Sequence, residues 1–199
     1  MEILTVCTGN ICRSPLAALL LSTRLADLGV DVSSAGVRGL ASAPMTPEAI
    51  DLALERGVGE ADADAHRSRF LTEGMLVAPD LILAMTRDHR RMIAELAPSR
   101  LRATFTLREF ARLAAAMTDA ELTASAVGAT DGARLRAAAA AVAANRGLVP
   151  PSDEPDGDDV IDPYRRDWEV YVRSADQLAP GLEQVERVVR LASAAAPPA

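Results

Sequence analysis

The sequence is poor in aromatic residues and carries no excess of positive charge. Aromatic side chains make up 3% of the 199 residues, which leaves few surfaces on which nucleic-acid bases could stack. The formal net charge is −7, and no basic stripe is present to collect phosphates, so nucleic acid is not an expected partner. Any anion that this protein binds is therefore expected to be held by a local arrangement of groups.

The chain also lacks segments that would take it to or through a membrane. Its longest apolar stretch, residues 135–144, is alanine-rich and interrupted by arginine, so no membrane span is expected. The first residues, MEILTVC, show neither the basic region nor the cleavage site of a signal peptide. The two cysteines cannot form a multi-bridge disulfide framework. Together these absences favour a cytoplasmic protein.

Short apolar runs alternate with segments that begin with helix-start signals. Four runs are predicted to be strands: residues 3–7, 30–35, 80–85 and 102–105. Helices are predicted over residues 15–28, 47–56, 87–97, from residue 107, and over 164–196 with an interruption near Pro180. This alternation predicts an α/β protein in three layers, with a parallel sheet flanked by helices on both faces.

The stretch from about residue 114 to 157 differs in character from the rest. It is alanine-rich, with helical patterns near residues 119–127 and 131–145, and it ends in the acidic run GLVPPSDEPDGDD. We interpret it as a helical surface insertion followed by an acidic loop, within a single domain of residues 1–199. Its simplest expected role is to cover part of the sheet surface.

The stretch VCTGNICRSP contains both cysteines and joins the first predicted strand to the first predicted helix. Cys7 and Arg13 have the C-x5-R spacing. A loop this short can aim successive backbone N–H groups at one point and so hold an oxyanion. Arg13 adds a planar fork that grips two oxygens. The helix N-terminus and Arg13 also favour the thiolate of Cys7, which makes Cys7 a candidate nucleophile.

The other residues of this loop are expected to shape the site. Ser14 is a predicted helix N-cap that would also donate its hydroxyl to the Cys7 sulfur, and Asn10 would hold the loop in shape. The remaining candidates for the phosphate-binding loop are Thr8, Gly9, Ile11 and Cys12. The lysine of a nucleotide-binding G-x-x-x-x-G-K-[ST] loop is missing. A buried strand-end cysteine beside an unrelated arginine is the alternative, which the following Ser-Pro disfavours.

The loop sequence resembles the signature of the low molecular weight protein tyrosine phosphatases. The similarity continues in SSAGV (33–37), TPEAI (46–50), LILAMTRDHRRMI (81–93), FTLREF (105–110) and DVIDPY (159–164), and it covers roughly residues 1–112 and 158–190. This resemblance implies a four-stranded parallel sheet, a phosphocysteine intermediate, and no metal or other cofactor. It also implies that Asp162, in the late Asp-Pro pair, is the acid that protonates the leaving group.

The expected substrate depends on few residues. Ile11 and Tyr164 would supply apolar walls for the ring of a phosphotyrosine. The sequence is also similar to the bacterial protein arginine phosphatases, which have threonine where this chain has Ile11. Leu40 stands near a position where many tyrosine-specific relatives carry an aromatic residue. We expect phosphotyrosine hydrolysis, with phosphoarginine hydrolysis as the alternative.

Two other functions are weaker alternatives. A thioredoxin-coupled arsenate reductase needs further cysteines, and the chain has none after Cys12. An inactive phospho-binding module would have lost Cys7, Arg13 or Asp162, and all three are present. The expected partners are thus a phosphorylated protein and, by analogy with bacterial relatives, a cognate tyrosine kinase.

Three further side chains have open interpretations. Cys12 could trap oxidised Cys7 in a disulfide, or it could be a small apolar side chain under the loop. His66 and His89 lack the spacing of metal ligands, and we expect them to be surface or capping residues.

Overall fold

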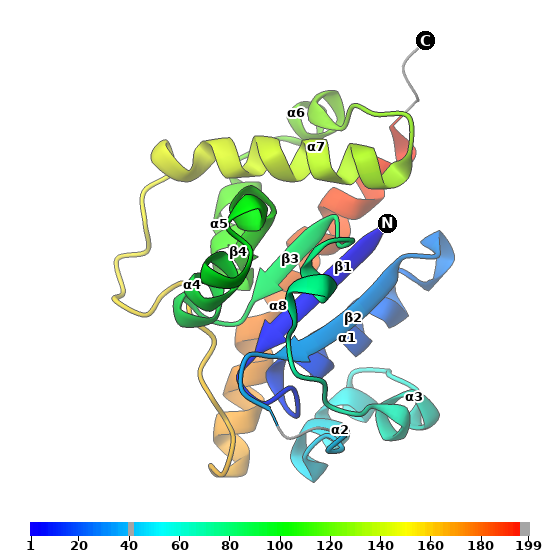
Figure 1. Ribbon diagram of the computed structural model, residues 1–199, viewed down its shortest axis with the longest axis vertical. Helices are drawn as coiled ribbons and strands as arrows, with labels where there is room; N and C mark the ends of the chain where they lie inside the picture. Colours follow the sequence, from blue (N-terminus) through cyan, green and yellow to red (C-terminus); the bar gives the residue numbers. More distant parts are fainter. Residues whose placement is uncertain (40–41, 196–199) are drawn as a thin grey trace.

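The computed structural model describes residues 1–39 and 42–195, and its centre is a four-stranded parallel sheet (Figure 1). The strand order is β2-β1-β3-β4. The strands are β1 (Glu2–Cys7), β2 (Asp31–Gly36), β3 (Leu81–Ala84) and β4 (Thr104–Thr106). Because all four strands are parallel, their carboxyl ends meet at one end of the sheet. Leu40, a candidate pocket residue, lies outside the described residues.

Helices connect the strands and cover the sheet. The α-helices are α1 (Arg13–Arg24), α2 (Pro47–Glu55), α3 (Glu60–Ala65), α4 (Arg87–Leu96), α5 (Leu107–Ala115), α6 (Asp119–Ser125), α7 (Asp131–Ala144) and α8 (Trp168–Ala194). Short 3₁₀ turns are η1 (Ala26–Leu28), η2 (Glu73–Leu76), η3 (Pro98–Ala103) and η4 (Asn145–Gly147).

Alternate residues of β1 face opposite sides of the sheet. Ile3 and Cys7 belong to the larger core, which α1, α5 and α8 cover. Leu4 and Val6 belong to a smaller core under α4 and η2. Both faces of the sheet are therefore buried, which explains why the strands read as nearly continuous apolar runs. The predicted three-layer α/β fold with a parallel sheet is confirmed.

The first helix begins two residues earlier than the sequence predicts. α1 starts at Arg13 with Cys12 as its N-cap, whereas the sequence pattern predicts a start at Pro15 with Ser14 as N-cap. The prediction is wrong because the Ser14 hydroxyl lies 3.0 Å from the Cys7 sulfur and does not cap the helix. Ser14 therefore stabilises the loop that precedes the helix and does not cap the helix itself.

Two other helix boundaries differ from the prediction. α1 ends at Arg24, and η1 carries the chain on to Gly29, whose φ of 60° lies in the left-handed region. α8 continues without interruption through Pro180. Its buried face packs along α5 and α1, and this burial outweighs the hydrogen bond that proline cannot make. None of the helices in the described residues combines the length and hydropathy needed to span a bilayer.

The helical insertion contributes to the larger core. Four residues of α7 are buried there: Leu135, Ala138, Ala139 and Val142. Arg134 is also buried, and its Nε donates to the carbonyl oxygen of Ala192 in α8 over 2.8 Å. Arg136 pairs with Asp80, which immediately precedes β3. In Figure 1, α6 and α7 lie beyond the end of the sheet at which β1 begins, so the insertion covers the amino ends of the strands.

The acidic segment after α7 runs to the opposite end of the sheet (Figure 1). Arginines of α4 and α5 hold it in place. Arg87 pairs with Asp156 over 3.2 Å and with Asp159 over 3.3 Å. Arg112 pairs with Asp158 over 3.0 Å. These ion pairs hold the acidic segment near the carboxyl ends of the strands. The Asp162-Pro163 pair follows shortly after this segment.

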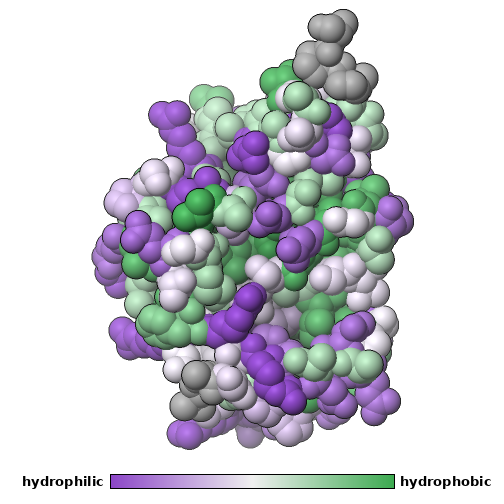
Figure 2. All heavy atoms as spheres, turned by 45° about the vertical axis from the view of Figure 1, so that its right-hand side comes forward, coloured by the Kyte–Doolittle hydropathy of each residue, from purple (hydrophilic) through white to green (hydrophobic). Residues whose placement is uncertain are grey.

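The surface is mixed in polarity. On the face shown in Figure 2, hydrophilic and hydrophobic side chains alternate over short distances. Large exposed apolar side chains such as Phe70, Val77 and Leu148 are spread over different elements.

Candidate active site

The loop between β1 and α1 curls at the carboxyl end of the sheet. Cys7 is the last residue of β1, and Arg13 is the first residue of α1. The turn requires Asn10 in the left-handed region, with φ of 56°. The end of β2 presses on the loop, because a Cβ at Gly36 would lie 2.7 Å from the carbonyl oxygen of Thr8. Only glycine allows this close approach.

The sulfur of Cys7 is buried and receives two hydrogen bonds. The Asn10 N–H donates to it over 3.2 Å, and the Ser14 hydroxyl donates over 3.0 Å. Ser14 lies in the first turn of α1, where the helix dipole is positive. Donors and dipole both stabilise negative charge on sulfur, so this environment suits a thiolate nucleophile.

The guanidinium of Arg13 is 4% exposed and is only partly satisfied. Its Nη1 donates to the Val160 carbonyl over 3.1 Å, and its Nη2 donates to the Thr8 hydroxyl over 3.3 Å. Nη2 also pairs with the Asp162 carboxylate over 2.8 Å. The buried Nε has no acceptor among the described residues. A buried donor without an acceptor lowers the stability of the folded protein. An oxyanion bound at this guanidinium would supply the missing acceptor.

Asn10 is the centre of a network that fixes the loop. Its Nδ2 donates to the hydroxyls of Ser14 (3.0 Å) and Ser34 (2.8 Å). Its Oδ1 accepts from the Arg69 N–H over 2.9 Å. Its own carbonyl accepts from Nε2 of His66 over 2.8 Å. Burial lowers the pKa of His66, so its imidazole is neutral at neutral pH.

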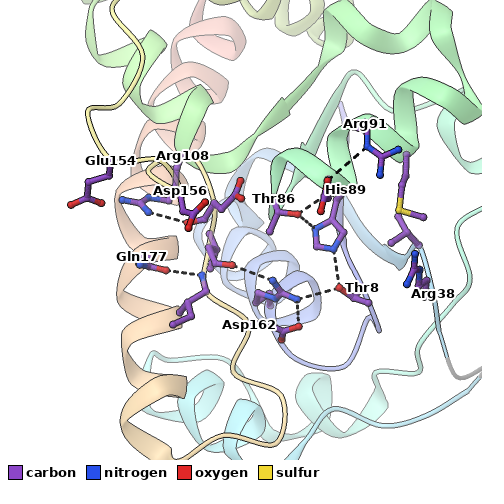
Figure 3. Close-up of a pocket in the computed structure, with 17 residues that line it drawn as sticks. Thr8, Arg38, Thr86, His89, Arg91, Arg108, Glu154, Asp156, Asp162 and Gln177 are labelled. Atoms are coloured by element: carbon purple, nitrogen blue, oxygen red, sulfur yellow. Dashed lines mark hydrogen bonds and ion pairs between the residues drawn. The ribbon is translucent and has the colours of Figure 1, made fainter.

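His89 joins the loop to the start of α4. Nε2 of this buried imidazole lies 2.9 Å from the Thr8 hydroxyl, and Nδ1 lies 2.9 Å from the Thr86 hydroxyl (Figure 3). Thr86 is also the N-cap of α4 and accepts from the His89 N–H. Burial, and then the charge of Arg13, lower the pKa of His89 to about 4. A neutral His89 therefore holds the hydroxyl that Arg13 contacts.

Asp162 lies at the edge of the same hollow, on the segment before α8. Its side chain is half-exposed and pairs with Arg13, as Figure 3 shows. The N–H of Tyr164 donates to Asp162 Oδ1 over 3.2 Å, which orients the carboxyl group. The segment is tied to α8 because the Ile161 N–H donates to Gln177 Oε1 over 2.8 Å. A carboxyl group is thus positioned across the cavity from the cysteine loop.

A cavity of about 360 Å³ opens above Cys7. Its lining residues are Cys7, Thr8, Gly9, Ile11, Cys12, Arg13, Arg38, Gly39, Asp162 and Tyr164. The structure therefore brings together the predicted nucleophile, arginine and acid, with Ile11 and Tyr164 on the walls. Asn10 and Ser14 lie behind the loop.

Cys12 is a buried free thiol under the loop. Its sulfur lies 3.6 Å from the Thr46 hydroxyl and 3.8 Å from the Tyr171 hydroxyl. Burial raises the pKa of Cys12 to about 11, so it is protonated at neutral pH. A protonated thiol attacks poorly, and closure of a Cys7–Cys12 disulfide is expected to be slow near neutral pH.

The sequence interpretation missed three contributors to the site. His66 and His89 both contact the cysteine loop, although they are expected at the surface or as caps. The carbonyl of Val160 holds Arg13. One signal for His89 was available, because Thr86 predicts a helix start at the carboxyl end of β3 and places His89 in its first turn. The His66 and Val160 contacts depend on long-range packing that no local pattern reveals.

Comparison with known proteins identifies the family. A family model described as low molecular weight phosphotyrosine protein phosphatase matches residues 2–123. This match covers more than half of the chain, and the chain therefore belongs to that family. The match ends before α7 and the segment that carries Asp162.

Individual relatives agree with this assignment. Low molecular weight protein-tyrosine-phosphatase Etp of Escherichia coli K12 is 47% identical over 97 residues, which are 49% of this chain and 62% of the relative. The protein-arginine-phosphatase of Geobacillus stearothermophilus is 43% identical over 109 residues, 55% of this chain and 70% of the relative. The crystal structure of the low molecular weight protein tyrosine phosphatase from T. tengcongensis superposes with a TM-score of 0.65 at 28% identity, covering 93% of this chain and 97% of that chain.

Proposed function

We propose that the chain is a low molecular weight protein-tyrosine phosphatase that hydrolyses phosphotyrosine through a phosphocysteine intermediate. The observation that carries this proposal is the buried Arg13 Nε, which lacks an acceptor among the described residues. Arg13 lines the same cavity as the Cys7 sulfur. A phosphate at this place would accept from Nε and present its phosphorus to the thiolate.

In the first step, the Cys7 thiolate attacks phosphorus and an S–P bond forms. The P–O bond to the tyrosine ring breaks, and its electron pair goes to the phenolate oxygen. Asp162 gives its proton to this oxygen, so that tyrosine leaves as a neutral phenol. Arg13 and the N–H groups of the loop stabilise the charge on the transferred phosphoryl oxygens.

The contact between Arg13 and Asp162 links phosphate binding to the position of the proposed acid. A phosphate dianion that binds Arg13 competes with the Asp162 carboxylate for Nη2. Once displaced, the carboxyl group loses a cationic partner and gains an anionic neighbour. The displaced carboxyl group would then lie beside the bound phosphoester, where the first step requires a proton donor.

In the second step, a water molecule attacks the phosphocysteine. An O–P bond forms, the S–P bond breaks, and the electron pair returns to the Cys7 sulfur as a thiolate. The Asp162 carboxylate, now deprotonated, takes a proton from the water. The Asn10 N–H and the Ser14 hydroxyl stabilise the sulfur as a leaving group. Inorganic phosphate then leaves the cavity.

The cavity walls favour an aromatic phosphoester. Ile11 and Tyr164 both line the cavity above Cys7, and both offer apolar surface to a ring. Protein arginine phosphatase is the second candidate, because relatives with that name match the chain at 38% and 43% identity. Ile11 offers no polar contact to a guanidinium, which favours phosphotyrosine.

The substrate assignment is tested by comparing phosphotyrosine and phosphoarginine peptides of the same sequence. Wild-type protein is expected to show a kcat/KM at least tenfold higher for phosphotyrosine, roughly the effect of one buried polar mismatch. The Ile11→Thr variant is expected to narrow this difference by raising turnover of phosphoarginine. A higher kcat/KM for phosphoarginine with Ile11 in place would contradict the assignment.

The same proposal indicates the class of substrate and the cellular compartment. We infer that the chain acts as one phosphatase domain on phosphorylated proteins, and that a cognate tyrosine kinase is a candidate substrate. The two free cysteines among the described residues fit a reducing compartment such as the cytoplasm.

A further inference from the structure

Arg38 stands at the rim of the catalytic cavity, immediately after β2. Its backbone N–H donates to the Thr8 carbonyl oxygen over 2.8 Å, so the root of its side chain is fixed beside the cysteine loop. The side chain is exposed. Within residues 1–39 and 42–195, its guanidinium has no hydrogen bond and no ion pair. A cation is therefore held at the mouth of the site, and no described residue pairs with it.

Neighbouring arginines differ from Arg38 because their guanidinium groups already have acceptors. Arg13 pairs with Asp162 over 2.8 Å. Arg91 pairs with Glu95 over 2.7 Å. Arg108 donates to a backbone carbonyl of the acidic segment over 2.9 Å. Of these four arginines, Arg38 is thus the one whose guanidinium has no acceptor among the described residues.

A second cavity of about 610 Å³ adjoins the catalytic cavity, whose volume is about 360 Å³. Four residues line both cavities and form their shared boundary: Thr8, Arg13, Arg38 and Asp162. Figure 3 shows the second cavity, with Arg38 on the side opposite Glu154 and Asp156. Arg87 and Arg108 partly offset the acidic side chains of the opposite wall, so it is the attraction to Arg38 that would favour an anionic group at its end of this space.

An extended substrate would reach both cavities at once. Side chains of an extended peptide alternate in direction along the chain, so a residue beside the phosphorylated one points away from the Cys7 cavity. The shared boundary places Arg38 within reach of such a neighbour. We propose that Arg38 forms a subsite for an anionic side chain, a carboxylate or a second phosphate, flanking the phosphorylated residue. This inference rests on the proposed phosphatase function.

The test compares phosphotyrosine peptides that differ in one flanking residue. Glutamate and glutamine are placed in turn on each side of the phosphotyrosine, and kcat/KM is measured at low ionic strength. Wild-type protein is expected to prefer glutamate on one side by about two- to fivefold, the effect of an exposed ion pair. The preference is expected to shrink at high salt because the pair is open to solvent.

Variants at position 38 decide whether Arg38 carries this preference. In Arg38→Gln the ratio of glutamate to glutamine is expected to fall to about one, and in Arg38→Glu it is expected to invert. Arg102→Gln is the matched control, because Arg102 is an exposed arginine on η3 with no side-chain partner among the described residues. It is expected to keep the wild-type ratio.

A third peptide, with phosphoserine in place of the flanking glutamate, separates the two possible anions. A preference for either anion that depends on Arg38 supports the subsite. Equal rates for charged and neutral flanks in the wild type, or a preference that Arg38→Gln retains, would overturn it. Hydrolysis of a small aryl phosphate by the wild type reports the proposed function separately, because that substrate has no flanking residue.

Discussion

Arg13 is the residue around which the other contacts of the site are arranged. Its three contacts reach two separate parts of the chain: the loop at Thr8, and the segment before α8 at Val160 and Asp162. The Thr8 contact depends on His89, which holds the same hydroxyl from the other side. A residue outside the C-x5-R loop therefore positions the arginine that we propose to bind the phosphate.

The protonation of His89 gives a pH-dependent prediction for stability. Its pKa in the folded protein is about 4, below the ordinary value near 6.5. Between pH 6.5 and 4 the unfolded chain binds more protons at this residue than the folded chain does. The free energy of unfolding is therefore expected to fall as the pH falls through this window, by up to about 3 kcal/mol.

The measurement is urea unfolding of wild type and His89→Gln between pH 7 and pH 4. Glutamine keeps a polar group near the Thr8 hydroxyl but does not titrate. The free energy of unfolding of His89→Gln is therefore expected to fall less than that of the wild type between pH 6.5 and 4. His89→Gln is also expected to retain most of the wild-type kcat. Parallel pH profiles for the two proteins would show that His89 is not held neutral.

At this scale, the sequence reveals residues that local spacing brings together. Cys7 and Arg13 could be predicted because one short loop fixes both of them. Asp162 could be assigned only through the family resemblance, since about 150 residues separate it from the loop. His89 and Arg38 contribute through contacts to Thr8 that depend on how β2, β3 and the loop meet. Their roles require the structure.

At the scale of elements, most helices and strands follow their sequence signals, and the start of α1 shows how an exception arises. Thr46, Thr86 and Gly29 stand at element boundaries, as turn and cap chemistry requires. Ser14 does not cap α1 because the Cys7 sulfur takes its hydroxyl. Local propensity thus fails at the position where the site needs the same side chain.

The alanine-rich insertion could be recognised as helical, but its packing could not be predicted. α7 consists largely of alanine, so no apolar stripe distinguishes its buried face from its exposed face. The structure shows that Leu135 is fully buried in the larger core, whereas Leu148, just after η4, is 79% exposed.

These two leucines provide a matched test of the insertion. Leu135→Ala is expected to lower the free energy of unfolding by about 2–5 kcal/mol, because it leaves a cavity between α7, α5 and α8. Leu148→Ala is expected to change it by less than about 0.5 kcal/mol. Chemical denaturation of both variants gives the comparison. Equal, small effects would mean that α7 only covers the surface.

At the scale of the whole molecule, the candidate active site and the helical insertion lie at opposite ends of the sheet. The carboxyl ends of the strands hold the cysteine loop, and the amino ends are covered by α7. The acidic segment connects the two ends and is held by arginine ion pairs. Changes in the insertion can therefore reach Asp162 through this segment without touching the loop.

Arginine also joins the helices of the larger core. All 21 basic residues of the sequence are arginine. Arg190 of α8 binds the Asp27 carboxylate over 2.8 Å and the Arg24 carbonyl over 2.7 Å, which ties α8 to the end of α1. A guanidinium can bind a carboxylate and a backbone carbonyl at once, which an ammonium point charge does less well. Although the net charge is −7, many of the arginines form ion pairs with nearby carboxylates.

The central claim is that Cys7 accepts the phosphoryl group of the substrate. It is tested most directly by quenching the protein during turnover of a phosphotyrosine peptide and identifying the phosphorylated residue by mass spectrometry. We predict one phosphoryl group on the peptide that contains Cys7 in the wild type, and neither adduct nor turnover in Cys7→Ala. Phosphate release by Cys7→Ala, or a phosphoryl group on another residue of the wild type, would contradict the account.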